Sequence, residues 1–428
     1  MGMNRFFWVL ALLLALAFPG WAGGFERLYD GKTLSGWTLV GGHGPGYVPS
    51  EGGVLTCPKE GGGNLFTKKE YSDFRLKFEF KLSPGGNNGI GIRAPLQGDA
   101  AYVGMEIQVL DDPAPEYAKL EPGQYHGSIY KVCAARRGAL KPTGEWNREE
   151  IIATGRRIQV IVNGKKTVDC DLNSVSDPET LASHPGILRE KGHVGFLGHG
   201  SLVEFRNVQL KDLSKPERDN RAPQGFTSLF DGKKLTGWKG LVENPVKRAR
   251  MSTAELAVKQ TQATEKALAH WGAKGGEIVY DGKNDNLCTE KDYADFELRV
   301  DWKIGPGGDS GIYLRGSPQV QIWDTALTKV GAEVGSGGLY NNQKNPSKPL
   351  AVADNPVGQW NRFTILMVGE RVTVYLNGQL VVNGTILENY WDRAQPIFPS
   401  GQIELQHHGN PIFFKNVYVR ELKSANPR

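Results

Sequence analysis

The sequence has few cysteines. Four occur in 428 residues, and their spacing fits neither a zinc knuckle nor a redox pair. Three lie in the first half and one in the second (Cys57, Cys133, Cys170 and Cys288), so a complete pairing would have to cross the two halves. One disulfide within the first half and buried free thiols therefore both remain open.

The sequence also lacks a strong excess of one charge. It has 51 Lys and Arg against 46 Asp and Glu, a net charge of +5 that is spread along the chain. A nucleic-acid binder would concentrate its basic residues on one face, so we expect no nucleic-acid partner. Because 39% of the residues are hydrophobic, wholesale disorder is excluded as well.

Long apolar runs are absent after the N-terminus. Residues 1–22 have the pattern of a signal peptide: Arg5, the apolar run Phe6–Phe18, and the small-residue site Gly20-Trp21-Ala22. The run is too short for a comfortable membrane span, and no later stretch could cross a bilayer. We therefore expect export to the periplasm or the exterior, with no integral membrane segment in the mature chain.

Familiar catalytic signatures are missing too. The sequence contains no His-Glu-x-x-His, no phosphate-binding loop with Gly-Lys-Ser/Thr, and no Gly-x-Ser-x-Gly elbow. Zinc-protease, P-loop and serine-hydrolase chemistry of these common types is therefore not indicated.

Glycine, by contrast, is abundant, and the chain repeats itself. The 55 glycines without a collagen-like period favour turn-rich β structure. One ordered set of motifs occurs twice, which indicates two copies of one domain. The matched pairs include Asp30-Gly31-Lys32 with Asp231-Gly232-Lys233, Gly36-Trp37 with Gly237-Trp238, Asn88-Gly89-Ile90 with Ser310-Gly311-Ile312, Trp146-Asn147-Arg148 with Trp360-Asn361-Arg362, and Asn163-Gly164 with Asn377-Gly378.

The repeat defines the domain boundaries. We expect a first domain at 24–212 (copy one), a polar, proline-flanked linker at 213–224, and a second domain at 225–422 (copy two). Apolar residues alternate with polar ones over 74–82 and 296–304, and each Asn-Gly pair joins two such runs as a type I′ hairpin. The sequence therefore predicts an all-β fold in which each copy is a two-sheet sandwich or jelly roll.

One segment of copy two has no counterpart in copy one. Residues 251–271 are rich in Ala, Lys and Gln, and Ser252 with Glu255 forms a capping box. We expect an inserted amphipathic helix that packs on the sandwich, in preference to a lid over the site.

Polar side chains recur at matching positions on strands that should be half apolar. Because side chains alternate along a strand, those two apart share one face. The recurring residues are Arg93, Glu106, Gln108, Asp111 and Tyr130 in copy one, and Arg315, Gln319, Gln321, Asp324 and Tyr340 in copy two. A solvated sheet face explains any one of them. The whole set suits a sugar, whose hydroxyls bond polar groups while aromatic rings cover its C–H faces.

A histidine precedes the last strand of each copy. His199 and His408 are each followed by glycine at equivalent positions. A structural histidine is the plain alternative, but a group that titrates near neutrality suits a general base.

These motifs in this order resemble the 3-keto-disaccharide hydrolase domain family, also described as 3-keto-glucoside 1,2-lyase/3-keto-2-hydroxy-glucal hydratase. The resemblance covers both copies. It implies a concanavalin-like jelly roll in each copy. It also implies action on glycosides already oxidised at C3, by β-elimination across C1–C2 and then hydration, which together amount to hydrolysis.

The implied chemistry assigns roles to the candidate residues. His408 or His199 would be the base and Arg315 or Arg93 would lie near the enolate oxygen, with Glu106 and Asp324 as further catalytic candidates. The expected hydroxyl ligands are Gln319, Gln321, Tyr340, Lys344, Gln406, Gln108, Asp111 and Tyr130. A divalent metal on Glu106, Asp111 or His199 is conceivable, but no spacing demands one.

The copies differ in ways that leave two functions open. Copy two has Gln319 in place of Glu106, and copy one has Leu197 in place of Gln406. Copy two keeps the fuller polar set, so the sequence favours it as the active or sugar-binding half. The alternative function is a carbohydrate-binding, lectin-like protein without turnover.

Overall fold

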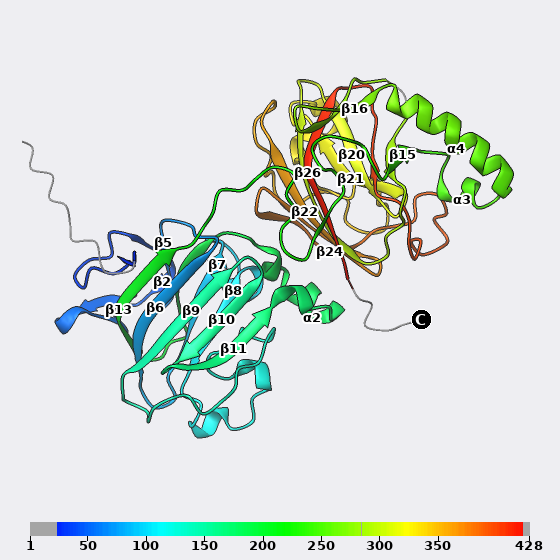
Figure 1. The fold of residues 1–428 in the computed structure, drawn as a ribbon. Coiled ribbons are helices and arrows are strands. Elements are labelled where there is room, and N and C mark those ends of the chain that lie inside the picture. The colour runs from blue at the N-terminus through cyan, green and yellow to red at the C-terminus, as the bar shows by residue number, and fades with distance from the viewer. Residues whose placement is uncertain (1–23, 284, 423–428) are drawn as a thin grey trace, which may run out of the picture.

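The computed structural model describes residues 24–283 and 285–422, and Figure 1 shows two β domains joined by a linker. The expected signal peptide lies outside the described residues. Each domain has one large and one small antiparallel sheet packed face to face, so the predicted all-β jelly-roll architecture is confirmed.

Copy one contains thirteen strands in the described residues. Its large sheet has the order β11-β10-β9-β6-β13-β4-β3, with β1 beside β13, and its small sheet has the order β2-β5-β12-β7-β8. The strands are β1 Glu26–Arg27, β2 Trp37–His43, β3 Val48–Ser50, β4 Val54–Cys57, β5 Gly62–Thr67, β6 Phe74–Leu82, β7 Asn87–Ala94, β8 Met105–Leu110, β9 Asn147–Thr154, β10 Arg157–Val162, β11 Lys165–Asp171, β12 His193–Gly198 and β13 Val203–Asp212. Two short helices, α1 (Ala100–Val103) and α2 (Pro178–Ser183), lie in the connections.

Copy two repeats this plan and adds helices. Its large sheet has the order β16-β17-β26-β19-β22-β23-β24, with β14 beside β26, and its small sheet has the order β15-β18-β25-β20-β21. The strands are β14 Thr227–Ser228, β15 Trp238–Gly240, β16 Trp271–Lys274, β17 Glu277–Tyr280, β18 Leu287–Thr289, β19 Phe296–Ile304, β20 Asp309–Leu314, β21 Ser317–Trp323, β22 Asn361–Val368, β23 Arg371–Leu376, β24 Gln379–Ile386, β25 Glu404–Leu405 and β26 Ile412–Glu421. The helices are α3 (Pro245–Arg248) and α4 (Thr253–Leu268).

The alternating residues form the cores, as the pattern predicts. In β6 every second residue from Phe74 to Leu82 is buried, and Phe196 packs on Phe205 with ring centroids 4.2 Å apart across the two sheets. Both Asn-Gly hairpins have positive φ at the two central residues (49° and 81° in copy one, 52° and 80° in copy two), which fits the predicted I′ turns.

The inserted helix α4 packs on the sandwich, as expected. Ser252 caps it by accepting a hydrogen bond from the Glu255 amide. Gln260 donates to the Gly240 carbonyl of β15 at 2.8 Å. A Cβ atom at Gly240 would lie 2.0 Å from the Ala263 carbonyl oxygen, so glycine lets the helix backbone approach the strand.

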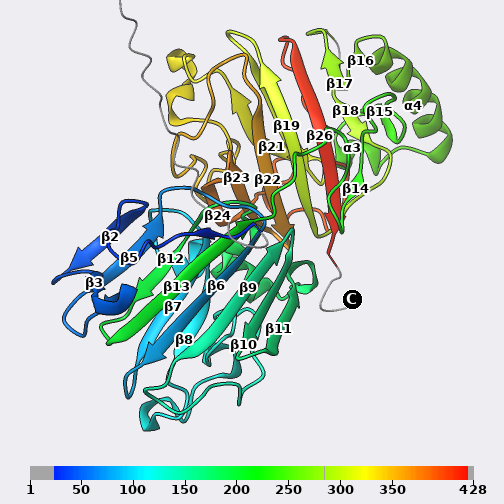
Figure 2. The same cartoon turned by 60° about the vertical axis from the view of Figure 1, so that its left-hand side comes forward.

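The two domains lie against each other, as the turned view in Figure 2 shows. The linker is fixed to copy two, because Glu217 pairs with Arg362 at 2.8 Å and Asn220 exchanges hydrogen bonds with Asn416. Across the interface, Arg156 of copy one bonds the buried Glu297 of copy two. The cores are also continuous at this point, since Leu366 and Tyr375 of copy two pack with the copy-one core.

Candidate functional site

The face of the small sheet turned away from the core of copy one holds a carboxylate–imidazole pair. Ile107 and Val109 point into the core, so Glu106 and Gln108 lie on the opposite face. Glu106 reaches across β7 to His199, whose Nε2 is 3.1 Å from the Glu106 Oε1 atom. A Cβ atom at Gly89 would lie 1.9 Å from that oxygen, so this glycine is what leaves room for the contact.

The electrostatics of the pair suit proton transfer. Glu106 is 3% exposed, while the His199 side chain is 43% exposed and open to a ligand. The hydrogen bond that His199 donates to Glu106 raises the pKa of His199 above its usual 6.5, against the opposing effect of burial. With Nε2 bonded to the carboxylate, Nδ1 is the ring atom that can exchange a proton with a substrate.

Amides and aromatic rings surround this pair. Gln108 donates to the Asn87 side chain at 2.8 Å, and the Tyr130 hydroxyl accepts from Gln124 at 3.3 Å. The Tyr102 ring lies edge-on to Tyr130, with centroids 6.3 Å apart. Together these groups offer hydrogen bonds and ring faces of the kind that bind sugars.

In copy two the carboxylate lies on the neighbouring strand, β20. Gln319 stands in place of Glu106, but Asp309 stands in place of Asn87. His408 Nδ1 lies 3.5 Å from the Asp309 carboxylate, and burial raises the pKa of Asp309. Gln321 donates to the same carboxylate at 2.8 Å and accepts from Gln319. The sequence alone shows that copy two loses a carboxylate at Gln319. The carboxylate that copy two gains at Asp309 was not predicted.

The two recurring arginines lie apart from these clusters, contrary to the expectation of an enolate-binding role. Arg93 is buried and donates to the Ser72 and Arg189 carbonyls and to Asp73. Arg315 does the same in copy two, with the Ala294 and Phe398 carbonyls and Asp295. Their guanidinium groups hold loops to the sheet edge, which explains why both copies keep them.

Four other candidates also have positions that do not join a cluster. Asp111 accepts from the Gly85 amide and the Thr143 hydroxyl, and Asp324 accepts from the Gly307 and Ala326 amides, so both stabilise turns. Tyr340 is half exposed against the Trp323 ring, and Lys344 lies exposed in a loop. Gln406 lies on the same face as Gln319, since both border the space above Gly311.

The conceivable metal ligands do not come together as a set. Glu106 and His199 are in contact, but the Asp111 oxygens are engaged in its turn. Within residues 24–283 and 285–422, no group of three or more His, Cys, Asp or Glu side chains is arranged to hold a metal ion. The four cysteines are free thiols in the structure, and Cys133 and Cys170 are in contact.

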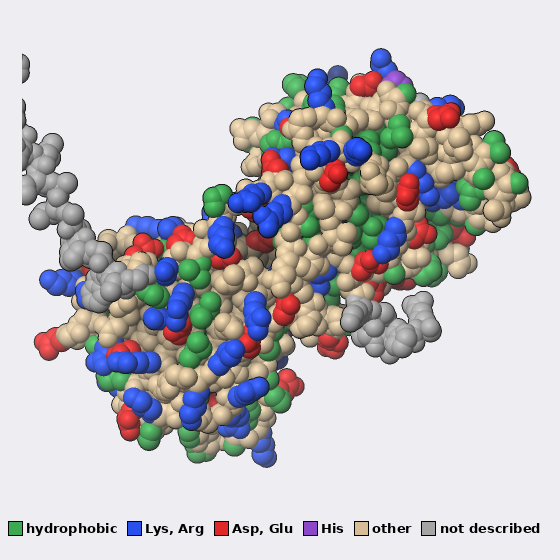
Figure 3. All heavy atoms as spheres, in the orientation of Figure 1, with side chains coloured by type: hydrophobic (Ala, Val, Ile, Leu, Met, Phe, Trp, Pro, Cys, Tyr) green, Lys and Arg blue, Asp and Glu red, His purple; other side chains and the backbone are tan. Residues whose placement is uncertain are grey.

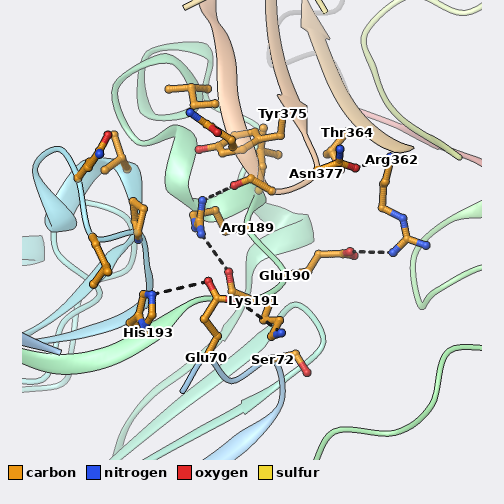
Figure 4. A pocket seen from close by; sticks show the side chains of 18 of the residues that line it. Glu70, Ser72, Arg189, Glu190, Lys191, His193, Arg362, Thr364, Tyr375 and Asn377 are labelled. Carbon is orange, nitrogen blue, oxygen red and sulfur yellow. Dashed lines mark hydrogen bonds and ion pairs between the residues drawn. The ribbon is translucent and has the colours of Figure 1, made fainter. Parts of the chain in front are cut away.

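A large groove, about 850 Å³ in volume, lies between the domains rather than on either sheet face. Figure 4 shows Arg189 at its centre, where the guanidinium bonds the Gly378 carbonyl at the tip of the copy-two hairpin. Glu190 pairs with Arg362 at 3.6 Å, and His193 lies 3.8 Å from Glu70. The groove does not include the Glu106–His199 pair, so we assign it to the domain junction.

The surface and the helices add two observations. Basic and acidic side chains are interspersed on the face that Figure 3 shows. In the part of the chain that the structure describes, no helix is both long and apolar enough to cross a membrane.

Comparison with known proteins gives relatives of one copy at a time. A 3-keto-disaccharide hydrolase of Bacteroides thetaiotaomicron is 29% identical over 240 residues, which cover 46% of this chain and 82% of that protein. A solved candidate glycosyl hydrolase of Parabacteroides distasonis is 28% identical over 44% of this chain and 99% of its own, with a TM-score of 0.38. A carbohydrate-binding module of Bacillus subtilis has a TM-score of 0.27 at 14% identity, covering 41% of this chain and 96% of its own.

A family model covers nearly all of the described chain. The model of the 3-keto-alpha-glucoside-1,2-lyase-like domain matches residues 24–211 and again residues 225–420. The chain therefore belongs to the 3-keto-alpha-glucoside-1,2-lyase-like domain family and carries the domain twice.

Proposed function

We propose that this protein is an exported enzyme that cleaves 3-keto-glycosides, with its proton-transfer site at the Glu106–His199 pair of copy one. The observation that carries the proposal is the 3.1 Å contact between a buried carboxylate and an accessible imidazole. Family membership and the name of the Bacteroides relative support the substrate class. The contact supports copy one as the active half, whereas the sequence favours copy two.

The reaction needs one base and one source of protons. A ketone at C3 acidifies the C2 proton, so a base can remove it to form an enolate. The electron pair then forms the C1–C2 double bond as the C1–O bond breaks, and the departing oxygen takes up a proton. Water adds across the double bond, with oxygen to C1 and a proton to C2, which completes hydrolysis.

The residues of copy one fit these steps. His199 takes the C2 proton on Nδ1, because Glu106 holds Nε2 and stabilises the imidazolium that forms. The imidazolium then returns this proton to the departing oxygen. Gln108 and the Tyr130 hydroxyl lie on the same side and bond the hydroxyl groups of the sugar.

The test is turnover of a 3-keto-disaccharide by the mature chain, followed through enone absorbance and release of free sugar. We expect His199→Asn and Glu106→Gln each to lower kcat by about 100-fold or more, the usual contribution of a general base. His408→Asn is the matched control in copy two and should turn over normally. Full activity in the His199 variant would overturn the assignment, and sugar binding without turnover by the wild type would make the protein a carbohydrate-binding one.

The pH profile gives a second test of the same assignment. A histidine base works in its neutral form, so kcat/KM should rise with pH through the pKa of His199. Because Glu106 raises that pKa, the limb should lie above pH 6.5. In Glu106→Gln the limb should move to lower pH, and an unmoved limb would show that another group titrates.

A further inference from the structure

Copy two has a pocket on the outer face of its small sheet, next to Gln406. The cavity measures about 770 Å³ and lies between the outer face of β25 and β20, the inserted segment around α3, and the loop that carries Trp391. We call it the Glu404 pocket, and its polar lining includes Glu404, Asn286, Tyr313 and Gln406. The volume is in the range of small-molecule sites.

The equivalent surface of copy one is filled with apolar side chains. Strand pairing makes Glu404 equivalent to Gly195, Tyr313 to Gly91, and Gln406 to Leu197. In copy one, Leu197 packs with Phe66, Ala94 and Ala100. A Cβ atom at Gly195 would lie 2.3 Å from the Leu65 carbonyl oxygen, so copy one has no room for a side chain there.

Glu404 is a buried carboxyl group in the pocket with few hydrogen-bond donors to stabilise its ionised form. It is 1% exposed and accepts a hydrogen bond from Asn286 at 3.3 Å. Burial raises its pKa to about 7, although Arg248 opposes the shift. The Arg248 guanidinium donates instead to the Val242 and Glu243 carbonyls, so Glu404 exchanges protons near neutral pH.

Gln406 and Trp391 are two further residues of the pocket that a ligand could contact. The Gln406 amide donates to the Tyr313 hydroxyl at 3.3 Å, while its buried carbonyl oxygen Oε1 has no partner in the described structure. A buried acceptor without a partner costs free energy, which a ligand hydroxyl would recover. Trp391 is fixed by a 2.7 Å hydrogen bond from its indole nitrogen to the Gly316 carbonyl and is one of the residues that line the cavity.

The chemistry of the lining selects the ligand. The lining also includes Lys247, which pairs with Glu243 at 3.0 Å, and Asp285. Charges of both signs are therefore present, and a strongly charged ligand is not favoured. An unpartnered amide oxygen, a carboxyl group, a second amide and an indole ring match the hydroxyls and C–H face of a pyranose.

We propose that the Glu404 pocket is a second carbohydrate site, independent of the Glu106–His199 pair, which binds a neutral pyranose ring with hydroxyls bonded to Glu404 and Gln406. The site does not depend on whether copy one cleaves 3-keto-glycosides. It gives copy two a role as the half that holds a glycan.

Calorimetric titration of the full chain with trehalose, maltose and methyl α-glucopyranoside tests the proposal, in a His199→Asn background that prevents turnover. We expect saturable binding of at least one probe, and a loss of about tenfold or more in affinity for Glu404→Ala and for Gln406→Leu, the residue that copy one carries. Trp391→Ala should weaken binding similarly.

Two controls make the result decisive. Glu404→Gln keeps the hydrogen-bonding shape and should retain affinity within about threefold, which separates a ligand contact from a folding defect. Arg148→Ala, a change at an exposed residue of copy one outside both sites, should leave binding unaltered. The proposal is overturned if no probe binds, or if Glu404→Ala and Gln406→Leu both bind as tightly as the parent.

Discussion

A single glycine decides whether the carboxylate of copy one can reach its histidine. A methyl group at Gly89 would lie 1.9 Å from the Glu106 carboxylate and would displace it from His199. We predict that Gly89→Ala lowers kcat on a 3-keto-disaccharide nearly as far as Glu106→Gln, by about 100-fold. Gly311→Ala, the matched change in copy two, should keep turnover. Equal activity in both alanine variants would contradict the assignment.

A second residue-scale prediction concerns Glu149 and His126, which are buried against each other in copy one. His126 Nε2 and both Glu149 carboxylate oxygens lack hydrogen-bond partners within the described structure, and the closest approach is 3.5 Å. Burial raises the pKa of Glu149 and lowers that of His126 to about 3, so both are neutral in the folded protein. Copy two has Phe363 and Ser336 at these positions.

The sign of the pH effect follows from linkage. Above pH 4.5 the unfolded chain loses the Glu149 proton that the folded chain retains, so the free energy of unfolding falls as pH rises. Glu149→Gln removes this dependence and should raise the Tm at pH 8 by about 2–4 °C per kcal/mol gained, with no gain near pH 4. Calorimetric melts at the two pH values measure it, and an equal shift at both would refute the linkage.

The residues also show what sequence reasoning can and cannot find. Glu106 and His199 were predictable, because a carboxylate and a histidine at repeated positions share the outer face. Arg93 and Arg315 recur for a structural reason, and repetition alone does not distinguish a loop anchor from a substrate ligand. Glu404 was missed because it occurs in one copy, although its alternation with Gln406 placed it on the polar face.

At the scale of elements, the strongest periodic patterns were predictable and the short pieces were not. The alternating strands, the Asn-Gly hairpins and the capped helix α4 all formed where the sequence predicts them. Helix α3 has four residues and β25 has two, which is too short for any period to show. Yet both border the Glu404 pocket, so the elements that shape this site are those that leave the weakest pattern.

At the scale of the whole molecule, one fully buried carboxylate lies among the contacts that join the domains. Glu297 is fully buried and bonds Arg156 of copy one together with Arg299 and Arg420 of copy two. Removing its charge would leave Arg156 and Arg420 buried without a carboxylate partner, while Arg299 keeps Glu190, at a cost of about 3–5 kcal/mol. We predict that Glu297→Gln lowers the Tm and splits the calorimetric transition into two.

An exposed glutamate ion pair provides the comparison. Glu421 pairs with Lys291 at the surface, and such pairs contribute about 0–1 kcal/mol. Glu421→Gln should therefore melt like the parent protein. If the two variants have the same Tm, Glu297 does not stabilise the interface.

The hairpin contact has one more consequence, for self-association. Arg189 of copy one donates a hydrogen bond to the Gly378 carbonyl of copy two. The position in copy two that is equivalent to Arg189 is Phe398, because the Arg189 carbonyl accepts from Arg93 and the Phe398 carbonyl accepts from the matching Arg315. A head-to-tail contact between like domains would propagate into a filament if every unit offered the same donor. Phenylalanine has no such donor, so copy two does not offer this contact to the hairpin of a further like domain.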